Sequence, residues 1–369
     1  MSSAVTDRPS RADLTIHGSE RPLRVLIAPH EIAGQMSLLA RGLRSRGIEA
    51  LSVDYYQRDG RGPGDPSCDV NLGLRSGERS LKRLAKTVSF AAWAAQYFDV
   101  FHFFYGESLL PGQRDLRLLR SMGRRIFVHF RGLDVTTMRY IRGVLEPLMS
   151  GQSPRSVPAS TPRQARRLAR WRRSADRLFV STPDMREFVP DAIWIPQVID
   201  LEEWPEAPEI APAGEVVVTH APTDPVKKGT KHVIAAVEAL RREGIPIRLE
   251  LLVRRSREEI RAAFARSHVG IDQVIYGAYG NVAIELMASG KPVIANVSRV
   301  HSDIPGLPIA HSQPYELKHR LRELVLNPEI RRRLGREGRA FVERRHALPV
   351  VVEDLIAQYS SGAAGVGRH

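Results

Sequence analysis

The sequence predicts an α/β protein of two domains, each a doubly wound parallel sheet with helices on both faces. The chain has 369 residues, whereas one domain usually has roughly 100–200. Short apolar runs alternate with amphipathic stretches throughout, as in repeated β-α units. The pattern breaks at 200–214, where three prolines and several acidic residues predict a stiff interdomain linker.

In the first half, strands are predicted where apolar residues stand together, and helices where they recur every three or four positions. The predicted strands are 24–28, 49–53, 100–104, 125–129 and 177–181. The predicted helices are 34–46, 81–97, 114–121, 163–174 and one capped by Thr182-Pro183-Asp184. Residues 57–77, rich in Gly, Pro and Asp, predict a long loop.

The pattern restarts after the linker. The predicted strands are 215–219, 247–253, 269–275 and 292–296. The predicted helices are 231–242, 257–267, 281–289, 315–326, 329–344 and 350–359. Because parallel strands present their carboxyl ends at one edge of a sheet, ligands are expected in a cleft between the two domains.

The composition is that of a globular protein, with 43% hydrophobic and 26% charged residues. No apolar run approaches the ~20 residues that span a bilayer, and the polar start of the chain is unlike a secretory signal. The single cysteine, Cys68, excludes an internal disulfide and a multi-cysteine metal site. We therefore expect a cytoplasmic protein.

The net charge is +14, and residues 154–177 contribute half of it, with eight Arg and one acidic residue. Within this stretch, helix 163–174 carries a thin apolar stripe of Ala165, Leu168, Trp171 and Ala175. The stripe either packs on the sheet, which we favour, or docks on an anionic membrane at the inner face. Nucleic acid is disfavoured, because no stacking aromatics interleave the arginines.

Several common site motifs are missing from the sequence. It has no Walker loop, no GxGxxG after a strand, and neither GxSxG nor HExxH. No Asp-x-Asp pair is present, so no metal-diphosphate clamp is expected.

Two segments of the second half carry candidate chemistry. His220–Thr230 places Lys227, Lys228 and Gly229 before a helix, where free amides and the helix dipole favour a phosphate. On its own, this segment is equally consistent with a solvated loop.

The second segment, Asp272–Ile294, ends a strand in Gly277-Ala-Tyr-Gly280 and opens a helix at Asn281. Glu285, one turn inside the helix, is placed to accept hydrogen bonds from a ribose. Leu286 and Met287 are expected in the core.

Together these segments resemble retaining glycosyltransferases of family 4, which have the GT-B fold. The residues that match its nucleotide-sugar motif are Gly280, Glu285, Met287, Ala288, Gly290, Pro292, Val293 and Ile294, and those that match its Lys-Gly are Lys228 and Gly229. The N-terminal half is similar at Ala33-Gly34-Gln35, Val128–Asp134 and Trp194–Asp200, and Asn327-Pro328-Glu329 resembles the family's C-terminal end.

The resemblance implies a metal-independent enzyme without a cofactor that transfers a sugar, with retention, from a nucleotide-diphosphate donor to an acceptor. The sequence does not identify the acceptor, and a polysaccharide, a lipid-linked molecule and a small natural product all stay open. It implies catalytic roles for Lys228, Arg131 and His129. Donor binding is implied for Gly34, His220, Lys227, Lys228, Tyr279, Gly280, Asn281, Val282 and Glu285. The implied domains are 21–199 for the acceptor and 215–345 for the donor, with helix 346–360 packing back on the first domain and disordered ends at 1–20 and 361–369.

The sequence departs from the family pattern at two sugar-contacting positions. Gly277 stands where the family has the first Glu of a pair, and Arg131 where it has His, although His129 lies two residues earlier. At Gly277 the site loses a hydrogen-bond acceptor for the donor sugar and gains room, which favours an acidic, deoxygenated or bulkier sugar. Alternatively, Tyr279 or Asn281 replaces the lost contact and the sugar is a common hexose. The alternative is a nucleotide-sugar-binding protein that has lost catalysis.

Overall fold

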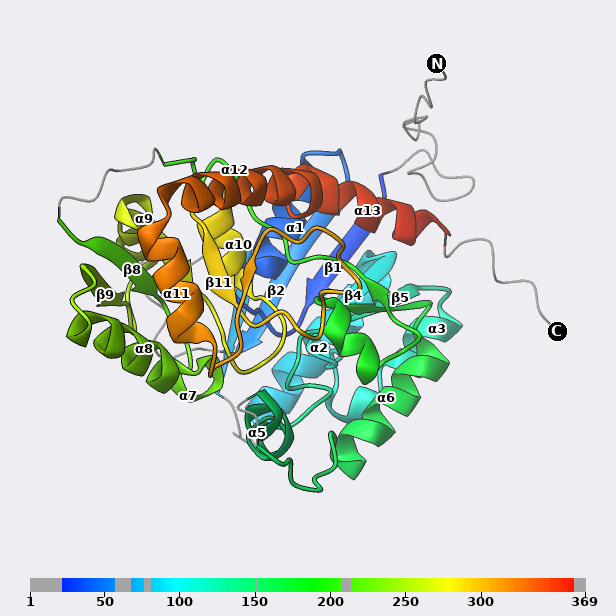
Figure 1. Cartoon of the computed structure of the whole chain (residues 1–369). Coiled ribbons are helices and arrows are strands. Elements are labelled where there is room, and N and C mark those ends of the chain that lie inside the picture. Colours follow the sequence, from blue (N-terminus) through cyan, green and yellow to red (C-terminus); the bar gives the residue numbers. More distant parts are fainter. Residues whose placement is uncertain (1–21, 57–67, 76–80, 150–151, 208–213, 362–369) are drawn as a thin grey trace, which may run out of the picture.

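The computed structural model describes residues 22–56, 68–75, 81–149, 152–207 and 214–361. It has the predicted class: two α/β domains, each built on a wholly parallel sheet (Figure 1). The predicted disordered start at 1–20 and most of the predicted tail lie outside the described residues, as does 208–213 of the predicted linker.

The N-terminal sheet has seven strands in the order β3-β2-β1-β4-β5-β6-β7. Their bounds are β1 Arg24–Ala28, β2 Glu49–Tyr56, β3 Val70–Leu74, β4 Val100–Phe104, β5 Arg125–Phe130, β6 Arg177–Val180 and β7 Ile193–Trp194. The side chains of each strand alternate between two cores. Val25 and Ile27 of β1 lie in one core, and Leu26 lies in the other.

Helices cover both faces of this sheet. One face packs on α1 (Gln35–Arg44) and the C-terminal α13 (Leu348–Ser361), and the other on α2 (Leu81–Tyr97), α3 (Leu116–Ser121) and α6 (Pro162–Ser174). The apolar stripe of α6 faces the sheet: Trp171 is fully buried, and Leu168 and Ala175 pack against the same core. These three members of the stripe therefore pack within the fold, as the favoured interpretation predicts, whereas Ala165 is exposed.

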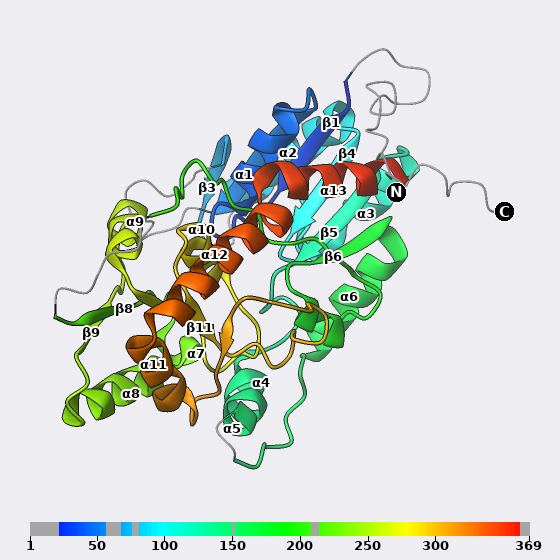
Figure 2. The same cartoon turned by 45° about the horizontal axis from the view of Figure 1, so that its top comes forward.

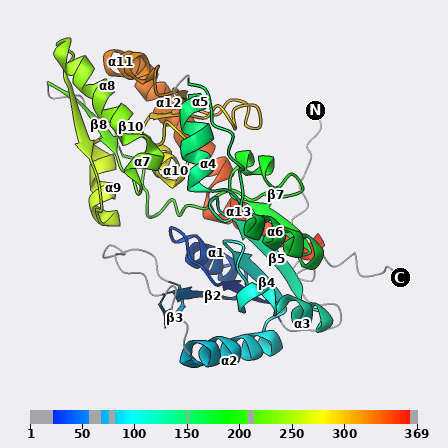
Figure 3. The same ribbon diagram turned by 90° about the horizontal axis from the view of Figure 1, so that it is seen from below.

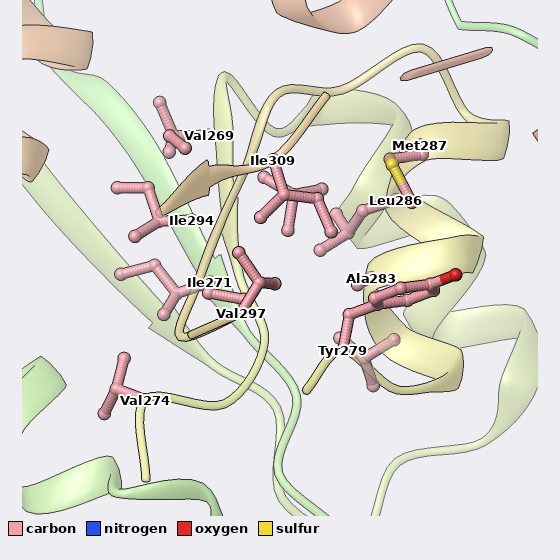
Figure 4. Packing of buried hydrophobic residues seen from close by; sticks show 14 of the residues in the cluster. Val269, Ile271, Val274, Tyr279, Ala283, Leu286, Met287, Ile294, Val297 and Ile309 are labelled. Atoms are coloured by element: carbon pink, nitrogen blue, oxygen red, sulfur yellow. The ribbon is translucent and has the colours of Figure 1, made fainter. Parts of the chain in front are cut away.

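The C-terminal sheet has five strands in the order β12-β11-β10-β8-β9. Its strands are β8 Val216–His220, β9 Ile247–Leu251, β10 Val269–Ile271, β11 Val293–Ala295 and β12 Ala310–His311. Its helices are α7 Pro225–Lys228, α8 Thr230–Arg242, α9 Arg257–Arg266, α10 Asn281–Ala288, α11 Leu317–Leu326 and α12 Pro328–Arg345. Leu286 and Met287 of α10 are fully buried in this core, which confirms their predicted place (Figure 4).

The structure differs from the prediction where pairing partners decide the conformation. Val70–Leu74, predicted as loop, forms the edge strand β3 because β2 supplies its hydrogen-bond partners. The helix predicted from Thr182 is only a short 3-10 turn, Pro183–Glu187. The strand predicted over 269–275 ends at Ile271. A helical segment from Met138 to Met149 (α4 Met138–Tyr140, a π-helical turn Ile141–Leu145 and α5 Glu146–Met149) was not predicted.

The end of the chain crosses from the second domain back to the first (Figure 2). α12 continues into α13, which lies against α1. The close approach depends on Gly42, because a Cβ at this position would lie 2.5 Å from Cγ2 of Val352. At the far end of α13, the Tyr359 hydroxyl lies 2.7 Å from Nδ1 of the buried His102 on β4. The last helix thus holds the two domains together, and Figure 3 shows it between them.

Across the described ranges, no helix is both long and apolar enough to cross a membrane.

Candidate active site

The predicted donor residues gather at the carboxyl edge of the C-terminal sheet. Lys227 and Lys228 end α7, which follows β8. Gly280 precedes α10, which follows the loop after β10. β8 and β10 are neighbours in the sheet, so the two segments that carry the motifs lie side by side.

A buried carboxylate that sequence reasoning missed joins these segments. Asp272, directly after β10, accepts a hydrogen bond from Lys228 Nζ at 2.6 Å through one oxygen and from the Gly280 amide at 2.7 Å through the other. Its side chain is fully buried, whereas that of Lys228 is 11% exposed. Asp272 thereby fixes the lysine beside the opening of α10. The signal in the sequence that could have identified Asp272 is an acidic residue directly after an apolar strand.

The first turn of α10 faces this pair with open backbone amides. Gly280 caps the helix without a side-chain hydrogen bond. The first bond of the helix runs from the Ile284 amide to the Gly280 carbonyl, at 3.2 Å. The amides of Asn281 and Val282 precede it and have no partner within the helix, so they and the helix dipole can hold an anion.

Lys227 is the less engaged of the two lysines. Its Nζ lies 5.1 Å from the ring centre of Tyr276, and it makes no salt bridge within the described part of the chain. Burial and the neighbouring Lys228 lower the pKa of Lys227. A negative charge bound beside Lys227 would favour its protonated form and so offset both effects on its pKa.

Glu285 lies where the domains meet. Its carboxylate lies 3.5 Å from Nη1 of Arg257. The other terminal nitrogen of Arg257, Nη2, lies 3.7 Å from the carboxylate of Glu203. Ala33 and Gln35, the neighbours of Gly34, line the same narrow gap as Glu285 and Asn281. Gly34 caps α1 in the left-handed conformation, at φ 75°. The structure therefore brings predicted donor residues of both domains together.

Three predicted site residues are buried, and two of them are engaged internally. The ring nitrogens of His220 contact the Ile271 carbonyl and the Thr230 hydroxyl, both at 2.9 Å, and burial lowers its pKa to about 4. The Tyr279 hydroxyl contacts His346 at 3.0 Å. His129 stacks on His102, with ring centres 5.5 Å apart. These side chains are therefore enclosed in the core, and Val282, 9% exposed, offers its backbone amide and not its side chain.

Arg131 is a cation at the carboxyl end of β5, in the N-terminal domain. Burial lowers its pKa to about 10, although Glu31 and Asp134 partly offset the effect. Its guanidinium lies over Phe104, 5.4 Å from the ring centre. Nη1 is buried and has no hydrogen-bond partner among the described residues. The residue thus offers a donor to a negatively charged group.

Gly277 corrects one expectation, because its missing side chain does not leave room. A Cβ at Gly277 would lie 2.7 Å from Cγ and Cδ of Arg299, and the backbone has φ +82°. Arg299 reaches across the cleft to Asp184 at 3.2 Å and Glu187 at 2.6 Å in the N-terminal domain. An interdomain ion pair therefore fills the space where a larger sugar was expected.

Nothing in the described ranges brings three or more His, Cys, Asp or Glu residues together as a metal site.

No protein-family model matches the chain. A curated protein, an uncharacterized glycosyltransferase of Methanocaldococcus jannaschii, is 32% identical over 101 residues. The match covers 26% of this chain and 29% of that protein.

Solved structures resemble nearly the whole chain. Sucrose-phosphate synthase of Thermosynechococcus elongatus has a TM-score of 0.64 at 18% identity, over 93% of this chain and 100% of that one. The catalytic domain of starch synthase IV of Arabidopsis thaliana, bound to ADP and acarbose, has a TM-score of 0.62 at 11% identity, over 93% of this chain and 99% of that one. Anabaena HepE, in complex with UDP-glucose, has a TM-score of 0.60 at 14% identity, over 92% of this chain and 99% of that one. At these identities the likeness concerns the fold, which is GT-B.

The Lys228–Asp272 pair yields a stability prediction. Lys228→Ala leaves a buried carboxylate with one hydrogen bond and no counter-charge, so the free energy of unfolding should fall by roughly 3–5 kcal/mol. Adding Asp272→Asn removes the stranded charge and should recover part of this loss. Urea denaturation followed by circular dichroism measures both changes.

Lys231→Ala is the matched control, because Lys231 forms an exposed pair with Glu146. Its loss should cost about 0–1 kcal/mol. Equal losses for Lys228→Ala and Lys231→Ala would contradict the structural role of the buried pair.

Proposed function

We propose that this protein is a glycosyltransferase that moves a sugar from a nucleoside-diphosphate donor to a hydroxyl group of an acceptor. The observation that carries the proposal is the site around Asp272. There a fixed lysine and the open amides of α10 lie at the carboxyl edge of the sheet, facing the other domain. In open α/β sheets, this edge is where ligands bind.

The site is suited to a departing diphosphate. As the bond between the sugar and the diphosphate breaks, negative charge grows on the diphosphate oxygens. Preorganised donors stabilise that charge more than they stabilise the ground state. Lys228, Lys227 and the amides of Asn281 and Val282 supply these donors, and Arg131 approaches from the opposite domain. We assign no nucleophile to the protein, so reaction with retention would depend on the positioning of donor and acceptor.

Glu285 is proposed to accept the hydroxyl hydrogens of the donor ribose. Two of the similar structures support a nucleoside-diphosphate donor, since they hold UDP-glucose and ADP. Arg257 already balances the charge of Glu285, so a neutral ribose suits this carboxylate better than a second cation would.

The first test is turnover. Nucleotide sugars that differ in base and sugar are ranked by thermal shift, and the best binder is assayed for transfer or hydrolysis. Lys228→Gln keeps a donor near Asp272 but removes the charge. It should lower kcat/KM by about 10- to 150-fold, the worth of a charged hydrogen bond. The anomeric configuration of the product, read by NMR, tests retention.

Unchanged kinetics in Lys228→Gln and in the double variant with Lys227→Gln would exclude this phosphate site. Binding of a nucleotide sugar without any turnover would favour the alternative, a binding protein that has lost catalysis.

The second test concerns the ribose. Glu285→Gln should weaken UDP binding by about 10-fold or more, because a carboxylate is the stronger acceptor. It should weaken binding of the 2′-deoxy analogue less. Isothermal titration calorimetry measures both affinities. Glu238→Gln, an exposed change on α8, is the control, and equal UDP affinity in both variants would refute the assignment.

The third test concerns metal. We propose that the positive groups of the site replace a divalent ion, so EDTA should leave the initial rate unchanged. A rate that collapses with EDTA and returns with Mg²⁺ or Mn²⁺ would overturn metal independence while leaving glycosyl transfer intact.

A further inference from the structure

A second cavity lies in the N-terminal domain, and the donor site does not use it. It has a volume of about 290 Å³ and lies at the carboxyl ends of β2 and β4, between α2 and α6. Tyr55 and Tyr56 end β2 on one side, and the loop from Gly106 to Gln113 forms another wall. Asp115 holds this loop, because it accepts hydrogen bonds from the Leu109 and Leu110 amides and from the Ser108 hydroxyl.

The lining of the cavity is strongly basic. It contains four arginines and a single carboxylate, Glu107. Arg163, Arg167 and Arg170 are spaced by four and three positions, so they share one face of α6, and Arg83 approaches from α2. Trp171, four residues after Arg167, is buried beside them, and its indole nitrogen donates to the Gly106 carbonyl of the cavity wall at 2.9 Å. The fold therefore holds these arginines over the cavity.

In the described ranges, none of the three arginines of α6 that line the cavity forms a salt bridge, and Glu107 is the acidic residue of the lining whose charge they share. Within the described residues, Arg163 has neither a hydrogen bond nor a salt bridge. Arg170 has one hydrogen bond, to the Gly112 carbonyl at 3.4 Å, and Arg167 donates to the Asp134 carbonyl. Guanidinium groups bind phosphate and carboxylate groups through paired hydrogen bonds. This excess of positive charge is consequently available to an anionic ligand.

Glu107 is the group of the cavity that can accept hydrogen bonds from hydroxyls. Its carboxylate accepts one hydrogen bond, from the Tyr56 hydroxyl at 2.9 Å, and retains further acceptor capacity. Tyr55 and Gln113 also line the cavity, but the Tyr55 hydroxyl and Oε1 of Gln113 are enclosed by the protein and have no partner in the part of the chain that the structure describes.

The cavity also adjoins the predicted catalytic segment. The Asp134 carbonyl that Arg167 binds belongs to the residue whose carboxylate accepts the Arg131 and Gly132 amides. Gly132 in turn lies against the other domain, since a Cβ there would be 3.8 Å from the Tyr276 hydroxyl. A ligand in the cavity would thus lie beside the segment that approaches the donor site.

We propose that this cavity binds the acceptor and that the acceptor is a polyhydroxylated anion, a sugar that carries a phosphate or carboxylate group. Its anionic group pairs with Arg163, Arg167 and Arg170, and its hydroxyls donate to Glu107. The assignment as acceptor rests on the proposed glycosyl transfer, whereas the anion site stands on the cavity alone.

Calorimetric titrations with D-glucose 6-phosphate, D-glucuronate and D-glucose test the proposal. At least one of the two anions should bind about 10-fold or more tightly than glucose, as expected for charged hydrogen bonds. Which anion binds more tightly distinguishes phosphate from carboxylate. The double variant Arg163→Gln/Arg170→Gln should lose that advantage. Arg166→Gln/Arg173→Gln removes the same charge from α6 outside the cavity lining and should retain it.

The proposal is overturned if glucose binds as tightly as both anions, or if the two double variants lose affinity equally. A UDP titration of the same variants separates this result from the donor site. Loss of anion binding with UDP affinity intact places the anion site away from the donor site. Failure of UDP to bind the parent, with the anion pattern as expected, would refute the proposed transferase and leave the anion site.

Discussion

The carboxylate of Asp272 holds together the parts of the chain on which the proposed donor site depends. It is fully buried at the end of a central strand, and its two oxygens bind a lysine from α7 and the amide before α10. A buried charge must be paired and hydrogen-bonded, so these contacts fix the position of both segments. The arrangement leaves the first amides of α10 and the remaining ammonium hydrogens directed at whatever binds there.

The relative position of the two domains has its own set of contacts. α13 packs on α1 and reaches His102 through Tyr359, while Arg299 binds Asp184 and Glu187 across the cleft. His346, where α12 ends, contacts both Tyr279 and the Gln197 carbonyl. The loop that carries Gly277 is therefore linked to these contacts between the domains. A change in the relative position of the domains would move this loop.

The arginine excess also acquires a structural meaning. Along 163–173 the arginines fall into two groups because a helix repeats every 3.6 residues. One group lines the cavity of the N-terminal domain, and others, such as Arg166 and Arg173, face solvent. Trp171 is buried, and its bond to Gly106 fixes which group faces the cavity.

Local sequence patterns predicted the two-domain parallel architecture, most strands and helices, and the two segments that form the proposed donor site. These features depend on apolar periodicity and on short motifs, which are local properties of the chain. Leu286 and Met287 were placed in the core for the same reason. The edge strand β3 could not be predicted, because its pairing energy comes from β2 and its own residues resemble a loop.

Which polar groups are engaged inside the protein, and which remain open to a ligand, depends on contacts between distant parts of the chain. His129, His220 and Tyr279 are candidate ligand contacts by type, but packing buries them. Asp272, Arg257 and Arg299 attract no notice in the sequence, because their roles come from partners 44, 28 and 115 positions away. The cavity of α6 joins residues from β2, α2, the loop after β4 and α6 in the same way. Charge pairing and burial act between elements that only the completed fold brings into contact, so they leave no local pattern in the chain.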